Sequence, residues 1–142
     1  MGRLVRRGLF PPLPETGNHR SLVHVADVVS AVRRVADDDR ANGRTYIVAG
    51  VEAPSGRELF DALRLAQGMP RINWSMSASL LRGGARLSDI FEKLTGRRLP
   101  FNDEVLDRLL NSAWYSPELI EHELGWRAQV SLSDGLCEML NK

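Results

Sequence analysis

The sequence has 142 residues, of which 19 are Lys or Arg and 18 are Asp or Glu, so its formal net charge is +1. This near-balance argues against a dedicated nucleic-acid-binding protein, which usually carries a clear basic excess. The chain has no apolar run long enough to span a membrane, and its single cysteine excludes an internal disulfide. We therefore expect a cytoplasmic protein with neither a nucleic acid nor a membrane as its partner.

The N-terminal stretch predicts the tail of a helix followed by extended chain. Residues 3–7 continue a helix that Gly8 ends, because glycine is favoured just past a helix terminus. Three prolines then hold residues 10–15 extended. The Val- and Leu-rich run at 21–25 predicts a first strand.

A helix is predicted to begin at Ala26 or Asp27. Asp27 suits its N-cap or its first turn, since a carboxylate at a helix N-terminus meets free backbone N–H groups. The buried face is predicted from apolar residues spaced three and four apart: Val28, Ala31, Val32 and Val35. The β-branched and aromatic residues at 45–48 then predict a second strand.

The middle of the chain predicts two helices around a third strand. Ser55 and Glu58 have the S-x-x-E spacing of a capping box, which indicates that a helix follows. Residues 71–76 predict a short strand, and a longer helix is predicted from about 78 to 94. The pair Gly83-Gly84 inside that helix indicates a bend or a close helix contact.

Three shorter helices are predicted in the last third of the chain. One begins near Asp103, the next is capped by Ser116, starts at Pro117 and ends at Gly125, and the last begins at Ser131. Cys137 lies on the apolar side of the last predicted helix. A buried packing thiol is therefore expected, because no base stands in a recognisable arrangement beside it.

The residues alone show no catalytic constellation. The three histidines lack metal-ligand spacing, and the chain has no G-x-S-x-G, G-x-x-x-x-G-K or G-x-G-x-x-G motif. The fold class predicted from the pattern is mixed α/β. We expect residues 1–142 to form one domain with about three short strands and about six helices, without a complete Rossmann sheet.

Several segments, taken in order, carry a family resemblance. Asn18–Asp27 reads N-H-R-S-L-V-H-V-A-D, and Gly43–Gly50 reads G-R-T-Y-I-V-A-G. Ser112–Trp126 contains S-A-W-Y-S and L-G-W, and Ser131–Leu136 reads S-L-S-D-G-L. Together they resemble the extended short-chain dehydrogenase/reductase family, which includes UDP-glucose 4-epimerases and sugar-nucleotide dehydratases and reductases. Ile47 departs from that pattern, since many members have asparagine there.

The resemblance implies the C-terminal, UDP-sugar-binding portion of an NAD-dependent epimerase or dehydratase. The segments Leu94–Phe101 and Ser112–Ser116 favour a UDP-glucose 4-epimerase-like enzyme of polysaccharide precursor metabolism. The family's Gly-rich NAD loop and Tyr-x-x-x-Lys pair are absent, since neither Tyr46 nor Tyr115 has a lysine four residues on. We therefore expect a chain that is inactive alone, binds no NAD, and needs the N-terminal NAD-binding half as its partner. Self-association through exposed packing surface is also expected.

The resemblance also implies the substrate contacts. Arg20 matches the family arginine that contacts the nucleotide's phosphate and ribose, a task suited to a guanidinium fork. Pro12 and Leu13 lie in a stretch that resembles the one whose backbone lines the uracil pocket. Arg108 is a candidate for a second diphosphate contact, with surface pairing to Glu104 as the alternative. For Arg20 the alternative is a surface arginine in a turn.

A different class of function stays open. Exposed apolar helix faces would suit a free-standing helical module that binds a partner protein and has no catalytic role. The three tryptophans do not decide between the two functions. Trp74, Trp114 and Trp126 are each more typical of a core than of a platform for a nucleotide base.

Overall fold

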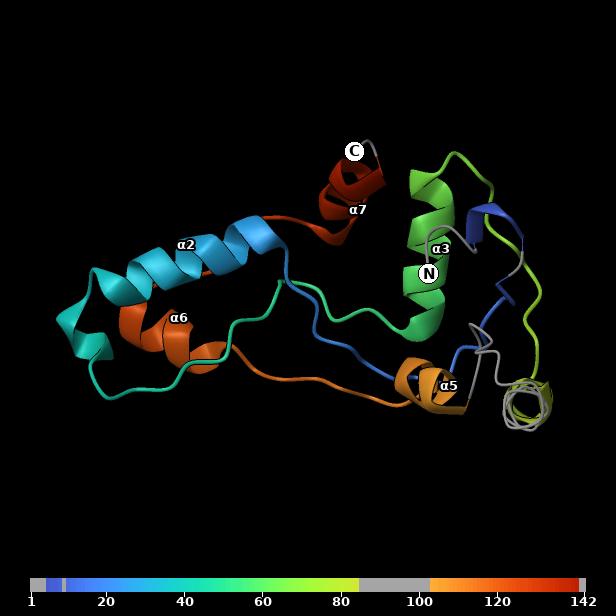
Figure 1. Ribbon diagram of the computed structural model, residues 1–142, viewed down its shortest axis with the longest axis horizontal. Helices are drawn as coiled ribbons and strands as arrows, with labels where there is room; N and C mark the ends of the chain where they lie inside the picture. The colour runs from blue at the N-terminus through green and yellow to red at the C-terminus, as the bar shows by residue number, and fades with distance from the viewer. Residues whose placement is uncertain (1–4, 9, 85–102, 141–142) are drawn as a thin grey trace, which may run out of the picture. The chain divides into compact units, whose positions relative to one another are not determined.

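The computed structural model describes residues 5–8, 10–84 and 103–140 (Figure 1). The chain divides into two compact units. Unit 1 comprises Met1–His19 and Ser55–Ser112, and unit 2 comprises Arg20–Pro54 and Ala113–Lys142. The elements with assigned bounds are α2 Val25–Ala36, the short 3-10 helix η1 Asp39–Ala41, α3 Gly56–Ala66, α5 Asp103–Leu110, α6 Glu118–Leu124 and α7 Leu132–Leu140.

The predicted mixed α/β fold is wrong. The regular structure of the described residues is helical, and they contain no β-sheet. None of the runs predicted as strands, 21–25, 45–48 and 71–76, forms one; the isolated β-bridge that is present joins Arg20 and Ala113. β-Branched composition favours extended backbone, but a strand also needs a neighbour that is hydrogen-bonded along its length. The sequence pattern supplies the first condition only.

Single backbone hydrogen bonds take the place of a sheet in unit 2. The Ser21 N–H donates to the Ala113 carbonyl at 2.9 Å, and the Gly50 N–H donates to the Leu22 carbonyl at 2.7 Å. The segment that leads into α2 therefore contacts two other segments without forming a ladder with either. At Gly50, an added Cβ would collide with the Leu22 carbonyl oxygen, so only glycine allows this approach.

Helix α2 has the predicted position but a different cap. His24 is its N-cap, and the His24 Nδ1 accepts the Ala26 N–H at 3.3 Å. Asp27 lies in the first turn and is buried, and its two carboxylate oxygens accept the N–H groups of Gln129 and Val130, each at 3.0 Å. Asp27 therefore joins the helix to a distant segment of unit 2 and does not cap it.

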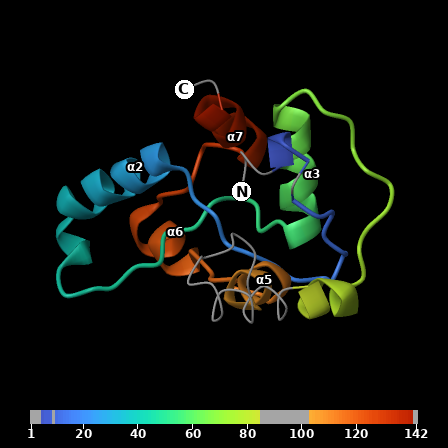
Figure 2. The same cartoon turned by 45° about the vertical axis from the view of Figure 1, so that its right-hand side comes forward.

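Two of the four residues predicted for the inner face of α2 are exposed. Ala31 is buried and Val35 is half-buried, whereas Val28 and Val32 are exposed. Helix α2 lies beside α6 in both views (Figures 1 and 2). The core of unit 2 is built from apolar residues of these helices and their flanking segments: Ala31, Ala41, Ile120, Leu124, Trp126 and Ala128. A helix so rich in valine has two apolar stripes, and the spacing does not say which of them is buried.

The buried thiol predicted at position 137 is also wrong. Cys137 is exposed, and none of the residues of α7 is buried. The predicted start of α7 is confirmed, because the Ser131 hydroxyl accepts the Asp134 N–H at 3.1 Å. A cap is a local feature, whereas burial depends on what packs against the helix.

In unit 1 the predicted capping box begins α3. The Ser55 hydroxyl accepts the Glu58 N–H at 3.1 Å, and the Glu58 carboxylate accepts the Ser55 N–H at 2.7 Å. Phe60 and Leu63 are the buried apolar residues of this helix, and Phe60 packs against Phe10 with 6.1 Å between ring centroids. The proline-rich stretch thus contributes to the core of unit 1.

The Arg57 guanidinium joins three segments of unit 1. It pairs with Asp61 one turn later at 3.1 Å and donates to the carbonyls of Leu13 at 3.2 Å and Trp74 at 3.1 Å. A further bond goes to the Ile72 carbonyl. An arginine offers five donors in a fixed fork, so one side chain can hold two irregular segments against a helix. This explains why residues 71–76 need no strand partner.

The long helix predicted for 78–94 is only partly described. Residues 78–84 are helical, and the remainder, with the Leu94–Phe101 motif, lies outside the described residues. A Cβ added to Gly83 meets nothing within 4 Å among the described residues, so the close contact considered for the glycine pair is not found there. Of the helices described, none combines the length and the apolar character needed to cross a membrane.

Acid should weaken unit 2 through Asp38, the residue that precedes η1. The hydrogen bond from Arg40 lowers the pKa of Asp38 from 3.8 to about 2. A depressed pKa stabilises the fold above the unfolded-state pKa, and the stabilisation is lost as pH falls from 3.8 towards about 2. We expect Asp38→Asn to unfold in less urea than wild type at neutral pH, and the difference to shrink through this range. A difference independent of pH, measured by circular dichroism, would contradict this assignment.

Candidate functional site

Arg20 lies at the start of the segment that leads into α2, within unit 2. Its N–H donates to the Pro54 carbonyl at 3.1 Å, and its backbone forms the bridge with Ala113. The residue is half-buried. Among the described residues, its guanidinium forms no hydrogen bond or ion pair. A positioned cation without a protein counter-ion can bind an anionic ligand.

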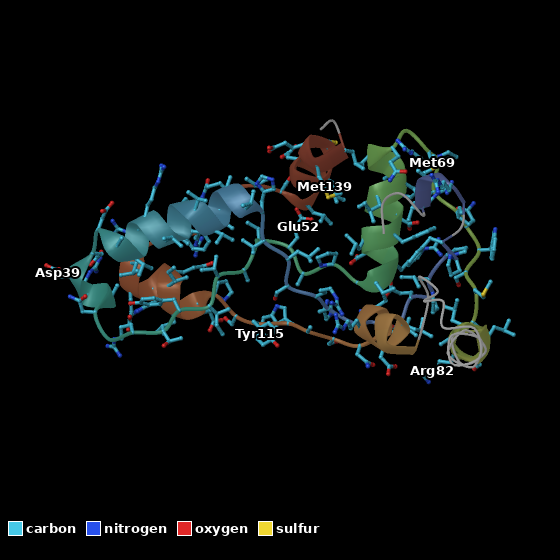
Figure 3. All side chains as sticks on the ribbon, in the orientation of Figure 1. Asp39, Glu52, Met69, Arg82, Tyr115 and Met139 are labelled. Carbon is cyan, nitrogen blue, oxygen red and sulfur yellow. The ribbon has the colours of Figure 1, made fainter. Side chains whose placement is uncertain are left out.

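A hollow of about 380 Å³ adjoins this segment, one residue after Arg20. Ser21, Trp114 and Tyr115 are among the residues that line it (Figure 3 labels Tyr115). The Ser21 hydroxyl accepts the Tyr115 N–H at 2.9 Å and lies 3.2 Å from the Tyr115 carbonyl, so two bonds hold these segments together. Trp114 and Tyr115 are 59% and 57% exposed. Their rings are available to stack on a flat ligand.

The arginine that lines the hollow has its charge already paired. The Arg127 guanidinium donates to the Glu121 carboxylate at 2.9 Å, and both residues line the hollow. Glu118 adds another carboxylate to the wall. Arg20 is not among the lining residues; it adjoins the hollow through its neighbour Ser21 and has no counter-ion among the described residues.

Unit 2 has a second cavity of about 460 Å³, and its chemistry is different. Its walls are mainly apolar, and they include Glu52, Glu138 and Met139 (Figure 3 labels Glu52 and Met139). The Glu52 carboxylate accepts the Leu132 N–H at 3.2 Å, and Glu138 lies 3.5 Å from the His24 Nε2. Its two carboxylates disfavour a phosphate group, as Glu118 and Glu121 do in the first hollow, where Arg127 is paired with Glu121.

Pro12 and Leu13, predicted to line a uracil pocket, lie in unit 1 and are buried there. The Leu13 side chain is 0% exposed. The Pro12 carbonyl accepts the Met76 N–H at 3.0 Å, and the Leu13 carbonyl accepts the Arg57 guanidinium at 3.2 Å. Both side chains are core residues, and both carbonyls already bind donors of unit 1. Their contact with a base stays a prediction.

Arg108, the predicted second diphosphate contact, lies on α5 of unit 1 and is exposed. It has an interaction partner within the chain. The Glu104 side chain lies outside the described set, so the alternative pairing of these two residues stays a prediction as well.

The sequence analysis missed the exposed aromatic pair at Trp114 and Tyr115. Of the tryptophans expected in the core, Trp126 is 7% exposed, whereas Trp114 and Trp74 are 59% and 60% exposed. The signal was the A-W-Y-S run itself, which precedes a helix start and has no apolar periodicity to bury its rings. For metals, the described residues contain no group of three or more His, Cys, Asp or Glu suited to hold an ion.

Comparison with known proteins gives a likeness of fold. No family model and no curated protein matches the chain. The structure is similar to the crystal structure of gox2253, with a TM-score of 0.60 and 20% sequence identity. The match covers 99% of this chain and 42% of gox2253. The chain therefore spans less than half the length of that protein, and at this identity the likeness concerns the fold alone.

Proposed function

We propose that this chain is the nucleotide-sugar-binding portion of an NAD-dependent epimerase or dehydratase. The carrying observation is Arg20, which is half-buried, has its backbone bonded to Pro54, and has no counter-ion among the described residues. A guanidinium so positioned can bind two oxygens of a diphosphate at once. The family resemblance around Arg20 supports the same role.

The proposed substrate is a UDP-sugar. Arg20 binds its diphosphate, and the exposed rings of Trp114 and Tyr115 offer faces on which the uracil can stack. Pro12, Leu13 and Arg108 stay candidate contacts on the family resemblance alone. We place the protein in the cytoplasm, in polysaccharide precursor metabolism, as a UDP-glucose 4-epimerase-like enzyme whose NAD-binding half is its partner.

The residues of this chain do not fit NAD. The Gly-rich loop and the Tyr-x-x-x-Lys pair are absent. Tyr46 donates its hydroxyl to the Glu123 carboxylate at 2.7 Å, and this bond raises the pKa of Tyr46 above its usual 10.0. A tyrosine that transfers protons near neutral pH needs the opposite shift. We assign no catalytic step to the chain and expect no turnover of UDP-sugars with NAD when it is tested alone.

Arg20→Ala should weaken the binding of UDP-glucose about tenfold or more, because a charge-assisted, two-pronged contact is lost. Binding is measured by chemical-shift titration, which detects the weak affinity expected of the isolated chain. Arg127→Ala is the control, since Arg127 lines the hollow that adjoins Ser21 and its guanidinium is paired with Glu121. Equal losses in the two variants, or no saturable binding by wild type, would remove Arg20 from the site.

A second candidate function is that of a helical module that binds a protein partner. The exposed valines of α2 favour it. These valines remain exposed among the described residues. A row of exposed apolar side chains on a helix usually marks an interaction surface.

A further inference from the structure

Helix α2 carries an apolar stripe on its outer side. Val25, Val29 and Val32 follow one another at helical spacing and are 67%, 47% and 62% exposed. The inner side of the same helix carries Asp27 and Ala31, which are buried. A helix of 12 residues is about 18 Å long, so these valines cover most of its length. We call Val25, Val29 and Val32 the valine stripe.

Opposite charges stand near the two ends of the valine stripe. Arg33 belongs to the last turn of α2, is exposed, and forms no side-chain hydrogen bond or ion pair among the described residues. Glu138 of α7 lies near the first turn, 3.5 Å from the N-cap His24, and its side chain is 51% exposed. Arg33, Glu138, Val25 and Val29 line one shallow hollow of about 480 Å³ along this flank.

We propose that the valine stripe binds a second copy of this chain, with the two α2 helices antiparallel about a two-fold axis. A two-fold axis perpendicular to α2 exchanges the two ends of the helix, and residues on one flank of a copy face residues on the same flank of the other copy. Arg33 of each copy then faces Glu138 of the other, and the two valine stripes pack together. A parallel pairing would put like charges at the same end of the pair and on opposite flanks, so it would bring no opposite charges together. The surface is thus self-complementary in one orientation.

The proposal rests on the second candidate function, to which it gives a partner, and it is independent of nucleotide-sugar binding. Apolar contact supplies the attraction, and the two symmetry-related charge pairs fix the orientation. The two pairs lie near the rim, so we expect the dimer to weaken at high salt.

Sedimentation equilibrium of the full 142-residue chain tests the proposal. Wild type should show a reversible monomer–dimer equilibrium. Val29→Asp should raise the dimer Kd at least about tenfold, because it places a carboxylate in the apolar interface. Leu65→Asp is the matched control, since Leu65 of α3 is 48% exposed, against 47% for Val29, and lies off the valine stripe. Circular dichroism checks that both variants fold.

Charge exchange tests the orientation. Arg33→Glu and Glu138→Arg should each raise the Kd about tenfold, and the double variant should return it to within about threefold of wild type. A wild type that stays monomeric up to roughly 1 mM, or a double variant that stays weak, would overturn the proposal. A chain that stays monomeric and uses α2 to bind an NAD-binding protein would also overturn the proposal. Titration of Val29→Asp with UDP-glucose separates the two proposals, because its nucleotide affinity should be unchanged.

Discussion

Asp27→Ala should lower the free energy of unfolding of unit 2 by about 3 kcal/mol. Asp27 is 3% exposed, and its carboxylate accepts the N–H groups of Gln129 and Val130 at 3.0 Å each. Hydrogen bonds to a charged group are among the stronger ones in proteins, and their removal leaves two backbone donors without an acceptor. The first turn of α2 also loses its link to the segment that precedes α7.

Urea unfolding measures this loss, and hydrogen exchange locates it, since the amides of Gln129 and Val130 should lose protection. Asp27→Asn should fall between wild type and alanine, because one amide oxygen can still accept one bond. Asp39→Ala, an exposed aspartate of η1, is the control and should change stability by no more than about 0.5 kcal/mol. If Asp27→Ala costs no more than this control, the carboxylate does not hold the two segments together.

Gly56→Ala should destabilise unit 1 by about 2–3 kcal/mol through steric overlap. A Cβ at position 56 would lie 2.5 Å from the Leu109 carbonyl oxygen and 3.4 Å from the Leu13 Cδ1. The oxygen belongs to the backbone at the end of α5, so the helices must move apart to admit a methyl group. The backbone of Gly56 is helical, and alanine would by itself be favoured there. The expected loss is therefore a packing effect.

Gly83→Ala provides the opposite result in the same unit. A Cβ at this helical position meets nothing within 4 Å among the described residues. We expect a gain of about 0.5–1 kcal/mol from the reduced freedom of the unfolded chain. Thermal unfolding followed by circular dichroism should thus move in opposite directions for the two glycines. A stabilised Gly56→Ala variant would show that α3 and α5 do not approach as closely as described.

Several helix starts and stops were predictable because each is decided within a few residues, although His24 and not Asp27 caps α2, and Pro117 and not Ser116 is the N-cap of α6. The capping box of Ser55 and Glu58 and the left-handed Gly125 at the end of α6 both have the predicted form. Strands were not predictable in the same way. The run at 45–48 has the composition of a strand, yet no neighbour pairs with it along its length. Burial likewise depends on distant partners, which is why Val28, Val32 and Cys137 were placed wrongly.

The candidate site was predictable only in part. Arg20 was identified from its motif, and the structure adds that its side chain has no counter-ion among the described residues. Trp114 and Tyr115 were overlooked, because a tryptophan is more often a core residue and no periodicity marked this one as exposed. Asp27 was identified as a structural residue, but its partners at 129 and 130 lie about a hundred positions away in sequence, beyond any local pattern.

The division of the chain has a consequence for how either unit can be made. The polypeptide passes between the units after His19, after Pro54 and after Ser112, so each unit is assembled from two separated stretches. No single cut releases one unit by itself, because any continuous stretch that contains all of one unit also contains part of the other. During synthesis the ribosome must deliver nearly the whole sequence before unit 2 can close. To make unit 2 alone, a short linker must replace the residues between Pro54 and Ala113.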